Sequence, residues 1–159
     1  MIQRIQTIYW LLAAVVLGIM LATPFARIFG VTEVTLSFFG TSPVAAEVIH
    51  AKGGLLELVR VPLVALAPLC LILNVVAIFL YKVTSWQIRL SIIAIVLQIC
   101  LMGLELYTFR ATKSLLGDAT IGHLTTTAYM PLIALALDFL AARGVIRDRN
   151  HLRRMDRIR

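Results

Sequence analysis

The chain has 159 residues, of which 60% are hydrophobic and only 14% are charged, and its formal net charge is +7. Ordinary soluble domains carry about a quarter charged residues, so this composition excludes that class and indicates an integral membrane protein. The length leaves room for one membrane domain, residues 1–159, and the two cysteines lie inside apolar runs, which excludes a disulfide framework.

Four long apolar runs predict an all-α membrane protein, a four-helix transmembrane bundle. Each run can cross a hydrocarbon core of about 30 Å, which takes about 20 helical residues. We expect the first run to be kept as a span, because ATPFA at its end is a poor signal-peptidase site. The expected spans are residues 5–26, 61–81, 90–109 and 120–142.

The first connection, residues 27–60, is long enough to hold structure of its own. Thr32–Phe38 alternates apolar and polar residues and is rich in β-formers, which is typical of a strand. A turn cluster, GTSP, follows at residues 40–43, and Val44–His50 alternates again. The pattern predicts a small extracytoplasmic β-hairpin between spans one and two, over the outer ends of the helices. A helix over Val44–Lys52 is the alternative.

Two amides lie inside the second and third spans. Asn74 and Gln98 are nearly equidistant from the turn between those spans, so at 1.5 Å rise per residue they lie at about the same depth. We predict an interhelical hydrogen bond between them, and a polar substrate path is the alternative. Cys70 and Cys100 also share a depth, and we expect them to be small packing residues.

Two carboxylates are the only charges inside the third and fourth spans. Glu105 is expected near the outer end of span three and Asp138 near the inner end of span four, too far apart to act as a pair. Each is expected to reach its membrane interface or to pair with a nearby base, because a buried carboxylate without a partner is costly. The candidate bases are Arg110 and Lys113 for Glu105, and Arg4, Lys82 and Arg89 for Asp138.

A basic tail, residues 143–159, follows the last span. We expect it to continue that span as a basic helix held at the anionic inner leaflet, where each basic residue contributes about 1 kcal/mol. Docking of a cytoplasmic protein or RNA is the alternative. Its arginines are Arg143, Arg147, Arg149, Arg153, Arg154, Arg157 and Arg159.

The distribution of basic residues orients the four spans. With both termini in the cytoplasm, ten basic residues lie inside and five outside, which agrees with the positive-inside rule. The outside set is Arg27, Lys52, Arg60, Arg110 and Lys113. We therefore expect a multi-pass protein of the bacterial inner membrane with both termini cytoplasmic.

The opening residues carry a resemblance. Met1–Thr7 reads MIQRIQT and precedes four spans, a long first outer loop and a charged tail. In this the chain resembles a family of uncharacterised four-span inner-membrane proteins of Bacteroidota, a domain of unknown function. The resemblance implies a location in the inner membrane and no activity, and it assigns no functional residue.

No constellation for catalysis follows from the residues. The chain has no paired carboxylates, no histidine cluster and no C-x-x-C motif, so we expect no catalytic, cofactor or metal site. We expect a non-enzymatic accessory or scaffold subunit of an inner-membrane assembly, with other membrane proteins and lipids as partners, and neither nucleic acid nor a small-molecule substrate. The alternative is a small transporter or channel component that uses the intramembrane polar residues Asn74, Gln98, Glu105 and Asp138.

Overall fold

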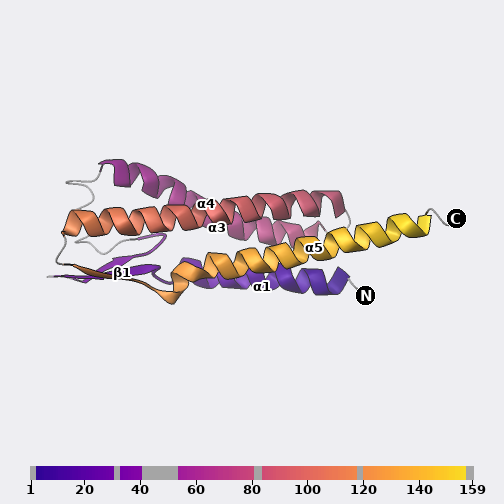
Figure 1. Ribbon diagram of the computed structural model, residues 1–159, viewed down its shortest axis with the longest axis horizontal. Helices are drawn as coiled ribbons and strands as arrows, with labels where there is room; N and C mark the ends of the chain where they lie inside the picture. The colour runs from indigo at the N-terminus through magenta and orange to yellow at the C-terminus, as the bar shows by residue number, and fades with distance from the viewer. Residues whose placement is uncertain (1–2, 31–32, 41–53, 81–83, 118–119, 157–159) are drawn as a thin grey trace.

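The structure is a computed structural model that describes residues 3–30, 33–40, 54–80, 84–117 and 120–156, with the side chains of 6–30, 33–40, 54, 58–80, 85–117 and 120–149. Four helices run along the long axis of the molecule, and a small sheet lies at one end (Figure 1). The elements are α1 (Gln3–Ala22), β1 (Ala26–Phe29), β2 (Glu33–Leu36), α3 (Gly54–Phe79), α4 (Thr84–Leu116), β3 (Ile121–Leu124), the 3-10 helix η1 (Thr126–Tyr129) and α5 (Met130–Asp156).

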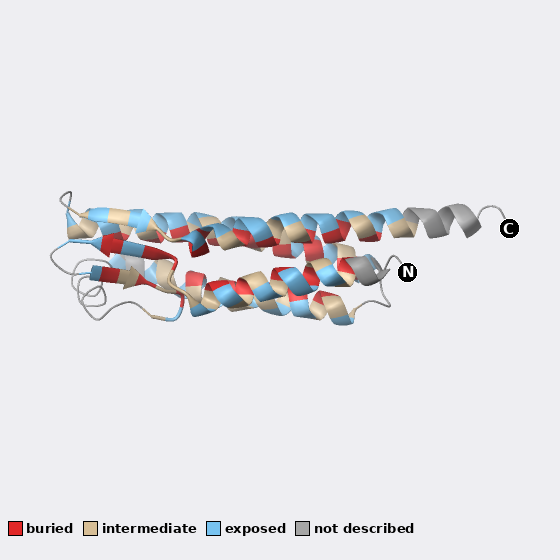
Figure 2. Cartoon of the chain, turned by 90° about the horizontal axis from the view of Figure 1, so that it is seen from below, coloured by how far each residue is buried: buried red, intermediate tan, exposed pale blue. Residues whose placement is uncertain are grey.

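Buried residues recur along each helix at alternating spacings of four and three. This spacing is the seam of helices that pack in a left-handed bundle. α1 packs against α3 and α5, and α4 packs against the same two helices. Figure 2 shows the buried residues on the faces that the helices turn toward one another. On α4, for example, the buried positions are Gln87, Ser91, Ala94, Gln98, Leu101, Glu105, Thr108 and Thr112.

α4 buries mostly polar residues and exposes large apolar ones. The α4 seam contains five uncharged polar residues and a glutamate, whereas α4 exposes large apolar side chains such as Ile92, Val96 and Ile99. A soluble bundle has the reverse arrangement, so the apolar surface is suited to lipid. Among the described residues three helical segments are long and apolar enough to cross a membrane: Leu58–Phe79, Ser85–Leu116 and Thr126–Arg149.

α1 and α4 differ in length from simple membrane spans. α1 is apolar over Gln6–Ala22, which is shorter than the other three. α4 has 33 residues, and at 1.5 Å per residue it is about 50 Å long, well beyond the thickness of a hydrocarbon core. It therefore continues past the bundle and runs beside the sheet (Figure 1).

The three-stranded antiparallel sheet closes the end of the bundle opposite the start of α1 (Figure 1). Its strand order is β2-β1-β3, with Ile28 opposite Val34 in one pair and Gly122 in the other. β1 and β2 bury alternate residues in one hydrophobic core with the bundle, and the rings of Phe25 and Phe38 contact each other at a tilt, with centroids 5.1 Å apart. The sheet is thus part of the same domain as the helices.

Gly122 explains how β3 lies against α4. A Cβ atom at this position would stand 2.9 Å from the Phe109 ring, which is closer than real contacts allow. A larger residue there would have to push the Phe109 ring aside, so glycine suits the close approach of the strand to the helix. At the other end of the connection, Gly117 adopts a φ of 98° directly after α4, the left-handed conformation that commonly ends a helix.

The sheet differs from the predicted hairpin. The strand expected within Thr32–Phe38 is confirmed as β2, but its described partner is β1, which we had assigned to the end of span one and the start of the loop. The predicted second strand, Val44–His50, its turn and the alternative helix there lie outside the described residues, apart from Gly40. β3 lies where we had expected the first residues of span four, so α5 begins ten residues later than that span.

Candidate functional site: a polar centre inside the bundle

Three polar side chains from three helices meet in the middle of the bundle. Gln98 of α4 donates a hydrogen bond from Nε2 to Oδ2 of Asp138 on α5 at 2.8 Å. Asn74 of α3 interacts with the same carboxylate and donates from Nδ2 to the backbone oxygen of Cys70 at 3.0 Å. All three are at most 1% exposed. We call Asn74, Gln98 and Asp138 the polar centre.

The polar centre corrects two predictions. Gln98 bonds to Asp138 rather than to Asn74, because a carboxylate is a stronger acceptor than an amide oxygen. Asp138 does not lie near the inner end of its span. Since α5 begins at Met130, this carboxylate lies about two turns into the helix and level with Gln98. The predicted equal depth of Asn74 and Gln98 agrees with the structure, in which both side chains interact with Asp138.

The polar centre has more acceptors than donors. Asn74 Oδ1, Gln98 Oε1 and Asp138 Oδ1 are all buried and receive no hydrogen bond in the described part of the chain. Gln98 Oε1 and Asp138 Oδ1 belong to the two groups that bond each other through Nε2 and Oδ2. A buried acceptor without a donor costs about 1–3 kcal/mol, and more if it is charged.

Glu105 lies two turns from Gln98 on the same face of α4. Seven residues separate them, which is about 10 Å along the helix. Glu105 is 1% exposed, and its Oε1 also lacks a hydrogen-bond partner among the described residues. The expected pairing with Arg110 does not form. Five residues correspond to about 140° around a helix, so the exposed Arg110 lies on a different face.

Other polar residues continue the buried face of α4 in both directions, and the sequence analysis missed them. Ser91, Thr108 and Thr112 return their hydroxyls to backbone oxygens four residues earlier. Gln87 donates to the backbone oxygen of Ala77 on α3 at 3.2 Å. Their spacing of four and three residues with Gln98 and Glu105 was visible in the sequence and could have revealed one polar face.

The end of the bundle away from the sheet has its own polar contact. Gln6 of α1 donates to Asp148 of α5 at 2.5 Å, which ties the first helix to the helical tail. Between this contact and the polar centre, Trp10 is buried against Ala77, Ala141 and Val145, and its indole Nε1 has no partner among the described residues.

The tail is helical as predicted, because α5 runs without a break to Asp156. Arg143 and Arg147 are exposed and Arg149 is half-buried. The side chains of the other four predicted tail arginines, Arg153, Arg154, Arg157 and Arg159, lie outside the described residues.

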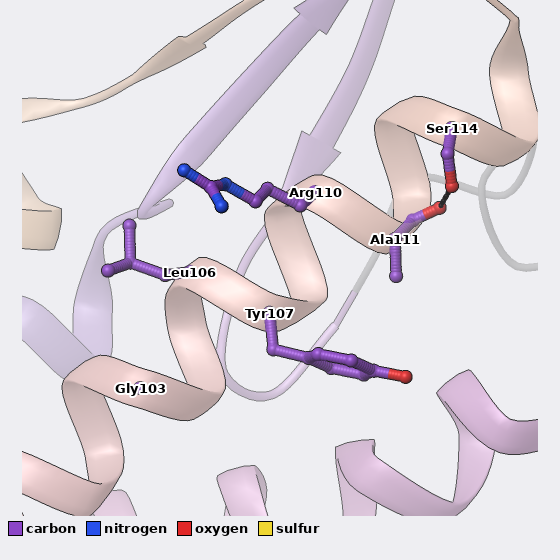
Figure 3. Close-up of a pocket in the computed structure, with 6 residues that line it drawn as sticks. All are labelled: Gly103, Leu106, Tyr107, Arg110, Ala111 and Ser114. Carbon is purple, nitrogen blue, oxygen red and sulfur yellow. Dashed lines mark hydrogen bonds between the residues drawn. The ribbon is translucent and has the colours of Figure 1, made fainter.

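A groove of about 690 Å³ lies on the outer surface of α4, toward the sheet end. Figure 3 shows the side chains that line it, with Ser114 Oγ bonded to the backbone oxygen of Ala111 at 2.8 Å. Tyr107 is 47% exposed, and a Cβ atom at Gly103 would meet nothing within 4 Å. The lining residues are Gly103, Leu106, Tyr107, Arg110, Ala111 and Ser114.

The cysteines and the acidic residues form no metal site of the usual kind. Within the described ranges, no three residues of the His, Cys, Asp and Glu types gather together. Cys70 is buried and Cys100 is exposed, and both are free thiols. The chemistry available inside the bundle is therefore that of oxygen acceptors around a carboxylate.

Comparison with known proteins places the chain in a family without assigning it an activity. The family model described as a domain of unknown function (DUF4293) matches residues 2–158. Neither the curated proteins nor the solved structures contain a match.

Proposed function

Because the chain belongs to the DUF4293 family, a domain of unknown function, its relatives supply no activity, and we propose from its own geometry that it is a non-enzymatic accessory subunit of a membrane assembly. The observation that carries this proposal is the groove on α4. It lies on the surface of the bundle, where a helix of a partner protein can reach it.

The groove residues have the pattern of a second helix-packing seam. Gly103, Tyr107, Arg110 and Ser114 follow one another at spacings of four, three and four, the same alternation as the buried seam on the opposite side of α4. A small exposed residue such as Gly103 lets a neighbouring helix approach closely, which favours association in lipid. Tyr107 and Arg110 add polar groups suited to the bilayer interface.

Co-purification in a mild detergent tests this proposal. Gly103→Leu fills the open space on the groove, and we expect it to release a partner that the native protein retains. Ala136→Leu is the matched control, since Ala136 is also an exposed small residue but lies on α5. A native protein that purifies as a monomer without a stable partner would contradict the proposal, as would equal retention by both variants.

We further propose that α1 also crosses the bilayer, that the membrane is the bacterial inner membrane, and that both termini are cytoplasmic. The ten-to-five bias of basic residues supports this orientation, with Arg143 and Arg147 at anionic lipid. In a Cys100→Ala background, a membrane-impermeant thiol reagent should label Ser114→Cys on intact cells and leave Arg147→Cys unlabelled. The reverse labelling would overturn the orientation.

A second candidate function is favoured by the buried carboxylates. Asp138 and Glu105 lie on the interior faces of their helices, and intramembrane carboxylates commonly mark ion or proton pathways. Under this proposal the protein is a small transporter or channel component. Ion flux into liposomes should then fall in Asp138→Asn and Glu105→Gln variants. Absence of flux, or flux that neither change affects, would exclude this function.

A further inference from the structure

The polar centre lacks positive charge. It contains one carboxylate and two amides, and three of their oxygens have no donor among the described residues. In the same part of the chain no salt bridge reaches Asp138. An isolated buried carboxylate is too costly to persist as an anion without a counter-charge, and amide nitrogens supply dipoles but no charge.

Among the side chains that the structure describes, no basic one on the surrounding helices supplies that charge. On α1 the only titratable residue between Gln6 and Ala22 is Tyr9, which packs beside Trp10. On α3 the titratable side chain that interacts with the carboxylate is the buried thiol of Cys70, and a thiol never carries a positive charge. On α4 Glu105 lies two turns away, and the exposed Arg89 lies nine residues from Gln98, about 13 Å along the helix.

α5, the helix of Asp138 itself, also offers this carboxylate no cationic side chain among the described residues. Arg143 is five residues further along α5, which turns it about 140° away, and it is exposed on the bundle surface. Oxygen atoms from three different helices with a single carboxylate among them match the requirements of one small monovalent cation, since hard cations prefer oxygen ligands and a single charge balances a single carboxylate.

We propose that Asn74, Gln98 and Asp138 form a binding site for one monovalent cation, either a proton carried by Asp138 or an alkali cation held by the three oxygens. A proton would let Asp138 donate to one of the two unpaired amide oxygens. An alkali cation would be shared by Oδ1 of Asp138 and those same oxygens. The site does not depend on whether the protein joins a larger assembly.

Thermal unfolding of the purified full-length protein in detergent tests the proposal and distinguishes the two cations. It is followed by circular dichroism between pH 5 and 9, in sodium, potassium, lithium or choline chloride at equal ionic strength. If the site holds a proton, the folded state keeps a proton that the unfolded carboxyl releases. The folding equilibrium constant then falls up to about tenfold for each pH unit in every salt. If the site holds an alkali cation, that cation raises Tm above its value in choline, most strongly at high pH.

In a Glu105→Gln background, which removes the other buried carboxyl of the described residues, Asp138→Asn should abolish either dependence, because the amide brings its own donors and carries no charge. Asp148→Asn, which changes a partly buried acid near the far end of α5, should retain it. A Tm that responds to neither pH nor cation, or an identical response in Asp138→Asn, would overturn the site.

Carbodiimide labelling of the native protein keeps the proposal testable if Asp138→Asn does not fold. Hydrophobic carbodiimides react with protonated carboxyl groups in apolar surroundings, and peptide mass spectrometry identifies the modified residue. We expect an adduct on Asp138 that increases as the pH falls, or that an alkali cation suppresses relative to choline. Glu105→Gln separates this adduct from labelling at Glu105. A protein whose Asp138 remains unlabelled at every pH, together with a cation-independent Tm, would contradict the inference.

Discussion

Replacing Gln98 by leucine tests how the polar centre holds the helices together. The change removes the 2.8 Å bond to Asp138 Oδ2, while Oδ1 of that residue already lacks a hydrogen-bond donor among the described residues. Hydrogen bonds between membrane helices average about 0.6 kcal/mol, but a newly unpaired buried acceptor adds about 1–3 kcal/mol. We therefore expect Gln98→Leu to lower the free energy of unfolding by about 2 kcal/mol.

The double variant should cost less than the single one. Gln98→Leu with Asp138→Leu removes both groups and leaves no unpaired carboxylate, and replacing a whole buried polar pair is often neutral or stabilising. Reversible unfolding in mixed micelles, measured for the native protein, both single variants and the double variant, gives the coupling free energy. Additive effects, or a cost of Gln98→Leu below about 0.5 kcal/mol, would refute the importance of this contact.

Three further predictions concern the ends of the bundle. Gly122→Ala should lower the free energy of unfolding by about 1–3 kcal/mol, because the new methyl group would stand 2.9 Å from the Phe109 ring. Adding Phe109→Leu to this variant should recover part of the lost stability in a thermal melt. Trp10→Ala should lower the free energy of unfolding by about 3–5 kcal/mol. Trp10→Phe should lower it less, because both changes remove the unpaired indole N–H but phenylalanine still fills most of the space. Equal melting temperatures of the two variants would contradict this. Asp148→Ala should lower stability by at most about 1.5 kcal/mol, since its bond to Gln6 is only partly buried, and a larger shift in chemical unfolding would show that this contact matters more.

The sequence allowed the helices to be predicted better than the strands. Long apolar runs identify α3 and α4, because lipid requires a length that hydropathy reveals. β1 and β3 have four residues each and are continuous with apolar runs, so hydropathy alone extends the neighbouring helices through them. Pairing between residues 94 positions apart in the chain, as between Ile28 and Gly122, leaves no local signal.

The candidate site was predictable in its residues but not in its contacts. Asn74, Gln98, Glu105 and Asp138 stood out because polar groups inside spans are costly. The depth of Asp138 depended on where α5 begins, and the unrecognised strand β3 displaced that start by ten residues. The partner of Gln98 therefore could not be predicted by counting residues from the turn between α3 and α4.

The sequence also predicts only in part which face of α4 the bundle buries. The buried seam and the exposed groove both follow spacings of four and three residues, so periodicity indicates two packing faces without saying which one the chain itself covers. The structure assigns the polar face to the bundle. The face with Gly103 and Tyr107 is left on the surface.

Photo-crosslinking in living cells tests most directly whether that exposed face binds a partner. A photoreactive amino acid replaces Tyr107 in the groove, and the same substitution at Ile133, exposed on α5, serves as the control. An accessory subunit should give one dominant protein adduct from position 107 that Gly103→Leu removes and position 133 does not produce. Crosslinks to lipid alone, or the same proteins from both positions, would contradict the proposed function.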